Sequence, residues 1–347
     1  MRSMYSELVK NKSWLDNESF ERLKVGSLLL PGLVSTGFAM KVGYALKGVP
    51  GFILAGLGFI FPGLSILLIA ALYYKELGQL QVLIPFLYGL KPAVLAIMAY
   101  TIIRLIFRYL TGFSYLAGFL VVVAGYFIGF DIIFLLLLAI CVSVFFTIGI
   151  QKEKLKKENL FPLLQINSLP VVLPAVPILS IFIKIGFFIA GSGFVILAFA
   201  KSELVDKGWM TIQTLLDSIA ISLFVPGPII GLAGFIGYQV LELHGALLAV
   251  VGILIPTILF AIIGLLFKDY LSQNRILKII SNSWHAGTLG YLTATVFQIS
   301  YTIMNDYKLW IIGIICLLIL LKFPKMQKAW ILIIGANMGY LLYHFLL

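Results

Sequence analysis

The chain has 347 residues, of which 61% are hydrophobic and 11% charged, and it carries a formal net charge of +11. A soluble domain carries about 25% charged residues. Together with a mean hydropathy of +1.09, the composition therefore excludes that class and indicates an all-α polytopic integral membrane protein. We attribute the positive charge to lysines and arginines on the cytoplasmic side rather than to nucleic-acid binding, with a basic path for anions as the second interpretation.

The predicted elements follow one another along the chain with short connections. The amphipathic stretch "SELVKNKSWLDNESFERL" at 6–23 is expected to lie along the membrane interface. Apolar segments then occupy 22–46, 50–74, 85–109, 113–129 and 131–150. The basic stretch 151–172, which contains "QKEKLKKEN", is predicted to be a cytoplasmic linker. Beyond it, apolar segments occupy 174–199, 213–241, 245–267, 281–304, 308–322 and 328–346.

An internal repeat relates the two halves of the chain. "SELVKNKSW" begins at Ser6 and "SELVDKGW" begins at Ser202, and a Pro-Gly pair follows the tryptophan of each stretch after seventeen residues. Further matches then hold a constant offset of 194 residues, at the first-half positions Gly43, Tyr44, Gly51, Gly58 and Pro62. We interpret the chain as a duplication, with a first repeat over 1–150 and a second over 173–347.

The two Pro-Gly pairs lie inside apolar segments, where they are expected to break a helix. Proline removes a backbone donor, and glycine permits backbone angles that reverse the chain. If all eleven segments cross from a cytoplasmic N-terminus, the linker lysines fall outside, against the positive-inside rule. If 22–46 and 213–241 are re-entrant hairpins instead, the basic loops fall inside. The sequence thus predicts two inverted-topology repeats with about nine full crossings plus two re-entrant hairpins, and eleven crossings are the alternative.

Paired broken helices predict a binding site for an anion. Backbone N–H groups freed by a break are tolerated at membrane depth only where protein buries them or water reaches them. In secondary transporters the positive ends of half-helices that meet near the midplane face an anionic substrate. A kink that only shapes packing is the other interpretation of each break.

The predicted substrate site combines the breaks with hydroxyls and cations. Its residues are Pro31, Gly32, Ser35, Thr36, Lys91, Ser192, Pro226, Gly227, Pro228 and His285. Lys91 and His285 match at the offset of 194, and an interfacial role is the alternative for both. Lys41 and Lys184 are candidates for the ion path, with a hairpin or interface role as the alternative. Asp217 is a candidate for accepting a coupled proton or for pairing with a lysine.

These residues carry a resemblance to the chromate ion transporter family. The resembling stretches include "SELVKNKSWLDNESFERLKVGSLLLPG" in the first half and "FVPGPIIGLAGFIGY" in the second. The PGP element, the following Gly-Tyr and the Gly-x(6)-Gly-x(3)-Pro spacing are its specific features. The resemblance implies a secondary transporter of chromate, and of sulfate, in the cytoplasmic membrane. The family's usual first helix, with a Gly-Gly-Pro motif, is expected to be missing, and the first-half PGP reads Pro31-Gly32-Leu33.

The function expected from the sequence is alternating-access transport of an inorganic oxyanion, coupled to a proton or a counter-anion. A passive anion channel on the same fold is the alternative, and a lipid-handling membrane protein is a more distant one. No P-loop, HExxH or metal-ligand spacing of histidines occurs, so we expect neither enzyme activity nor a cofactor or metal. The oligomeric state is open, a homodimer included.

Overall fold

The structure is a computed structural model that describes residues 2–77, 84–150, 177–189, 193–225, 227, 229–267, 270–271, 274–304 and 306–345. Every regular element in these ranges is a helix. Among the described residues, three helices are long and apolar enough to cross a membrane, over Val34–Tyr74, Pro85–Tyr109 and Ile230–Leu266, and four shorter apolar helices accompany them. The predicted all-α membrane class is therefore confirmed. The predicted linker 151–172 lies outside the described residues.

The helices keep the order of the apolar segments. They are α1 (Arg2–Tyr5), η1 (Ser6–Asn11), α2 (Asn17–Leu29), α3 (Val34–Leu77), α4 (Ile84–Tyr109), α5 (Phe113–Ile128), α6 (Ile132–Ile150), α7 (Pro177–Phe188), α8 (Val195–Ala200), η3 (Lys201–Val205), α9 (Ile212–Phe224), α10 (Ile230–Leu266), α12 (Arg275–Ile303), α13 (Tyr307–Lys322) and α14 (Lys328–Phe345). Here η1 and η3 are short π-helical turns.

The first break separates α2 from α3 where the sequence predicts it. The Asp16 carboxylate caps the start of α2 by accepting a hydrogen bond from the Ser19 N–H. After Leu29 the backbone becomes extended, and Gly32 has a φ of +102°, which disfavours any residue with a Cβ. The two arms fold back on each other, because Phe20 before the break packs against Phe38 after it, with ring centroids 5.1 Å apart.

The second break lies between α9 and α10, where the backbone becomes extended at Val225. Tyr74 of α3 contacts both arms, since its hydroxyl donates to Asp217 of α9 and its ring lies 5.7 Å from that of Phe235 in α10. Helices α2 and α9 have 13 residues each, or about 20 Å at 1.5 Å per residue. Both are shorter than the hydrocarbon core of about 30 Å. This length fits a re-entrant arm, while the inverted topology and the number of crossings stay predictions.

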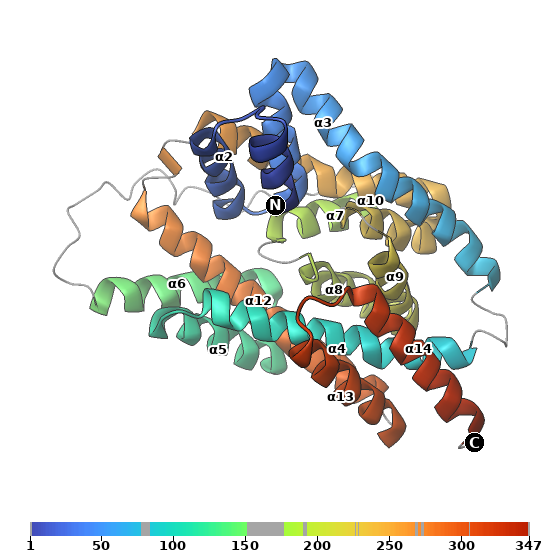
Figure 1. Ribbon diagram of the computed structural model, residues 1–347. Helices are drawn as coiled ribbons and strands as arrows, with labels where there is room; N and C mark the ends of the chain where they lie inside the picture. The colour runs from blue at the N-terminus through green and yellow to red at the C-terminus, as the bar shows by residue number, and fades with distance from the viewer. Residues whose placement is uncertain are drawn as a thin grey trace.

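Both α3 and α10 reverse direction inside their length, at positions 194 residues apart. Lys47 and Gly48 have φ, ψ of −143°, 23° and 61°, −146°. Leu241 and Glu242 have nearly the same angles, −139°, 35° and 50°, −142°. The reversal of α3 forms the apex at the top of Figure 1. The two halves therefore share a backbone turn in the register that the repeat predicts.

Matched glycines explain why each reversal closes so tightly. A Cβ added to Gly43 would lie 2.1 Å from the carbonyl oxygen of Gly51 on the returning arm. In α10, a Cβ on Gly237 would lie 2.3 Å from the carbonyl oxygen of Gly245. Only glycine permits this backbone approach at either position, so four of the repeated glycines are packing requirements.

The helices form two groups. In one of these groups, helices of the first half of the chain pack mainly against helices of the second half. One group contains α2, α3, α7 and α10, and α3 packs along α10 (Figure 1). In the other group, α4 of the first half packs against α13 and α14 of the second, while α12 packs against α5 and α6 of the first. This reciprocal packing is expected for halves related by a pseudo-two-fold axis. Helices α8 and α9 contact both groups.

The segment 174–199 differs from the expectation of a single crossing. Helix α7 ends at Phe188, and α8 begins only at Val195. Of the residues between them that the structure describes, Ile189 is not helical, and Gly193 and Phe194 form a turn. The described part of the chain thus holds a third interrupted helix.

Candidate anion-binding site

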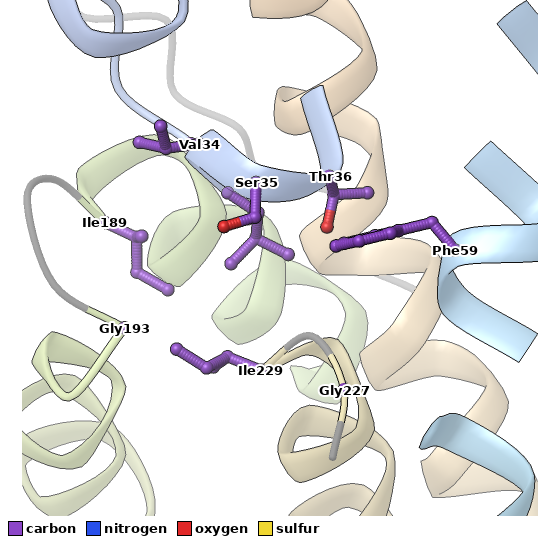
Figure 2. Close-up of a pocket in the computed structure, with 10 residues that line it drawn as sticks. Val34, Ser35, Thr36, Phe59, Ile189, Gly193, Gly227 and Ile229 are labelled. Atoms are coloured by element: carbon purple, nitrogen blue, oxygen red, sulfur yellow. The ribbon is translucent and has the colours of Figure 1, made fainter. Parts of the chain in front are cut away.

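The three interruptions meet at one cavity of about 190 Å³ (Figure 2). The start of α3 supplies one wall, and the segments between α7 and α8 and between α9 and α10 supply the others. The lining residues are Gly32, Leu33, Val34, Ser35, Thr36, Phe59, Ile189, Gly193, Gly227 and Ile229. A hydrogen bond of 2.8 Å from the Gly32 N–H to the Ile189 carbonyl joins two of the interruptions directly.

The first turn of α3 presents unused backbone donors to this cavity. The N–H groups at a helix start have no acceptor within the helix. That of Leu33 donates to the Thr257 hydroxyl at 3.4 Å. Those of Val34, Ser35 and Thr36 have no acceptor in the described part of the chain. Together with the helix dipole, these donors make the cavity wall electropositive.

Two hydroxyls add to these donors. Figure 2 shows the side-chain oxygens of Ser35 and Thr36 on the cavity side of the α3 ribbon, with the Phe59 ring beside Thr36. Ser35 is exposed, whereas Thr36 is completely buried and its oxygen has no hydrogen-bond partner. A buried hydroxyl without a partner is unfavourable, so Thr36 is poised to bond to a ligand or to water.

The second half contributes the start of α10 to the same cavity. The N–H groups of Leu232 and Ala233 donate to the Ile229 carbonyl, which leaves those of Ile230 and Gly231 without an acceptor in the described residues. Gly227 lets the chain pass Gly63 of α3, since a Cβ there would lie 3.1 Å from its Cα. Two helix N-termini, one from each half, therefore converge on a cavity that has no carboxylate among its described lining residues.

Lys41 belongs to the same arm of α3, but its side chain lines a neighbouring slot and not the main cavity. Its side chain is only 1% exposed and occupies a slot between α2 and α10, where Gly26 and Gly264 make room for the ammonium group. The slot shares Leu33 and Val34 with the main cavity. Within the described residues Lys41 makes no hydrogen bond or ion pair, so its amino group is open to a ligand that enters the slot.

Lys91 and Asp217 are not among the described residues that line the main cavity. Asp217 accepts a 2.7 Å hydrogen bond from Tyr74 through Oδ2, while its Oδ1 is buried without a partner. Lys91 of α4 is close enough to interact electrostatically with this carboxylate. The structure thus brings together a candidate cation and the candidate coupling acid that the sequence treats separately.

His285 and Lys184 also lie outside the main cavity. The His285 ring bonds through Nδ1 to the Ser281 carbonyl and stacks on Tyr109, and it lines a separate cavity of about 180 Å³ that includes Pro31. Lys184 forms an ion pair with Glu203, which also pairs with Lys207. The predicted residues Ser192, Pro226 and Pro228 lie outside the described residues.

Several lining residues were not predicted from the sequence. They are Leu33, Val34, Phe59, Ile189, Gly193 and Ile229. The sequence Gly191-Ser192-Gly193 inside an apolar segment could have predicted that the helix there is interrupted, because glycine and serine are weak helix formers. No local pattern marks Phe59 or Ile189, because they reach the cavity only through the packing of distant helices.

Comparisons with known proteins agree over nearly the whole chain. The sequence profile of a family described as chromate transporter matches residues 1–145 and 176–340. A chromate transport protein of Cupriavidus metallidurans is 27% identical, over 98% of this chain and 87% of its own length. A probable chromate transport protein of Synechococcus elongatus is 26% identical, over 97% and 88%. An uncharacterized transporter of Methanocaldococcus jannaschii is 24% identical, over 96% and 87%. No solved structure matches the chain.

Proposed function

The chain belongs to the chromate transporter family, and we propose that it carries chromate, or a similar tetrahedral oxyanion such as sulfate, across the cell membrane as a secondary active transporter. The observation that supports this most directly is the convergence of two helix N-termini on one cavity whose described lining residues include no carboxylate.

The chemistry of the cavity suits such a substrate. A tetrahedral dianion presents four acceptor oxygens, and donors that bond to a charged acceptor form stronger hydrogen bonds than neutral pairs do. The N–H groups and hydroxyls at the start of α3 supply donors from one side, and the start of α10 supplies them from the other. A volume of about 190 Å³ equals that of roughly six water molecules, which leaves room for one oxyanion with a few waters.

The way the helices are grouped suggests how the cavity opens to each side in turn. Helices α3, α7 and α10 belong to one group, while α4 and α12 with their partners form the other. Rocking of one group against the other would expose the cavity alternately, as in other transporters built on repeats. Asp217, held by Tyr74 and near Lys91, is our candidate for coupling this motion to a proton.

The test is uptake of labelled chromate and sulfate by proteoliposomes, with and without a proton gradient. We expect saturable uptake that Thr36→Val weakens. Thr295→Val is the matched control, since Thr295 is equally buried but its hydroxyl bonds to the Tyr291 carbonyl within α12. Absence of uptake of both anions by folded protein would refute the proposal. Voltage-driven current without saturation or coupling would identify a passive channel instead.

A further inference from the structure

A further cavity of about 210 Å³, which we call the second cavity, lies directly beside the main cavity at Ser35 and Thr36, the first cavity. The two share Gly193, Gly227 and Ile229 in their linings. The second cavity extends from these residues towards Ser222 at the end of α9 and Lys328 at the start of α14. It therefore continues the proposed anion path away from the start of α3.

Ile229 forms the boundary between the two cavities. Its side chain packs so closely on Gly193 that a Cβ added to that glycine would lie 1.4 Å from the Ile229 Cδ1 atom. Figure 2 shows the side chain reaching from the α10 side of the first cavity towards Gly193. Ile229 thus lines both cavities and packs on Gly193, another residue that they share.

The second cavity is positively charged. The Lys328 ammonium group lies 4.5 Å from the centre of the Phe194 ring, which orients it without neutralising its charge. Among the described residues, none that lines this cavity is acidic, and Lys328 forms no ion pair. Arg104 of α4, which is not among the described lining residues, adds a like charge within electrostatic range of Lys328.

Two neighbouring cations without a carboxylate repel each other, and an anion between or beside them removes this repulsion. The Ser222 hydroxyl donates to the Ile219 carbonyl at 2.7 Å, so the cavity supplies its attraction through charge rather than through that donor. Its apolar remainder, which includes Leu67 and Leu232, limits access of water and strengthens the attraction.

We propose that the Lys328 cavity is a second station for the tetrahedral dianion, which the Ile229 side chain separates from the station at Ser35 and Thr36. This inference rests on the proposed function, because it identifies a further binding site on the same transport path. It assigns to Lys328 the role of binding the anion by charge during passage.

A local reporter tests this station independently of transport. In a protein with Cys141 and Cys316 replaced by alanine, Ser222→Cys places a thiol on the cavity wall, and its rate of labelling by uncharged methyl methanethiosulfonate is measured against sulfate concentration. We expect sulfate to slow the labelling. A further Lys328→Gln substitution should raise the half-protecting concentration about tenfold, since a charge-assisted bond is lost. Lys325→Gln is the matched control, because Lys325 lies exposed in the same connection and does not line the cavity.

The outcomes separate the two proposals. No protection by sulfate, or equal protection in the Lys328→Gln and Lys325→Gln proteins, overturns the second station, even if uptake depends on Thr36. Protection that requires Lys328 supports it, even if wild-type proteoliposomes take up neither chromate nor sulfate, in which case the transport proposal falls alone. Lys328→Arg keeps the charge and should protect within about threefold of wild type, which guards against a folding defect in the glutamine variant.

Discussion

Replacing Thr36 with valine should stabilise the protein and weaken anion binding at the same time. Valine has nearly the shape of threonine but lacks the hydroxyl, which is completely buried and has no partner in the absence of ligand. An unpaired buried polar group costs about 1–3 kcal/mol, so the free energy of unfolding should rise by up to that amount. A hydrogen bond to a charged ligand contributes about 1.5–3 kcal/mol, and its loss should weaken binding by about tenfold or more.

Two measurements on detergent-purified protein follow both effects. The thermal unfolding midpoint reports stability without anion, and its increase with added sulfate reports affinity. Ser143→Ala is the control, because the Ser143 hydroxyl of α6 is likewise buried without a partner but does not line the cavity. It should leave sulfate binding unchanged. The hypothesis that the Thr36 hydroxyl bonds to the anion would be wrong in either of two cases. The Thr36→Val protein could be less stable than wild type, or it could bind sulfate equally well.

Three further predictions address the backbone, the topology and the coupling. Gly32→Ala should lower the free energy of unfolding by at least about 1 kcal/mol, because Gly32 has a φ of +102°. Thermal unfolding in detergent measures the loss of stability, and an unchanged unfolding midpoint would contradict the prediction. Single cysteines at Lys47 and Leu243 in a cysteine-free protein should be labelled from opposite sides of the membrane, and labelling from one side would exclude the inverted re-entrant topology. Asp217→Asn retains an acceptor for the Tyr74 hydroxyl, so we expect a folded protein whose uptake no longer responds to a proton gradient; a retained response in the proteoliposome assay would remove Asp217 from coupling.

The parts of the fold that the sequence predicts are those that depend on backbone geometry. Proline and glycine restrict or extend the allowed angles wherever they occur, so the breaks near Gly32 and Gly227 could be placed before the structure was known. The repeated glycines likewise signal close helix approach, which Gly43 and Gly237 show. The exchange of helices between halves has no such signature, because it depends on which apolar faces fit together among many of similar hydrophobicity.

Part of the candidate site was predicted from the sequence because it depends on the position of a helix break. Gly32, Ser35 and Thr36 stand at a break, and a break fixes where the helix start points its donors. Lys91 and His285 were linked by matching sequence positions, but equivalent residues of two-fold-related halves lie on opposite sides of the axis. Lys91 accordingly lies near Asp217, whereas His285 lies beside Tyr109. A match between the two repeats therefore identifies residues at equivalent positions of the two halves. It does not imply that these residues contact one another.

Similar backbones with different side chains imply that the two halves contribute unequally to anion binding. At the offset of 194, Lys41 of α3 corresponds to Phe235 of α10. Phe235 is completely buried and packs on Tyr74, while Lys41 is 1% exposed without a partner in the described residues. A buried lysine without a partner is unfavourable whether it keeps or loses its proton, so packing alone gives no reason for a lysine where the other half has an aromatic ring. An anion near the start of α3 would stabilise the protonated form of Lys41, so we expect the first half to attract the anion more strongly even though both halves supply a helix N-terminus.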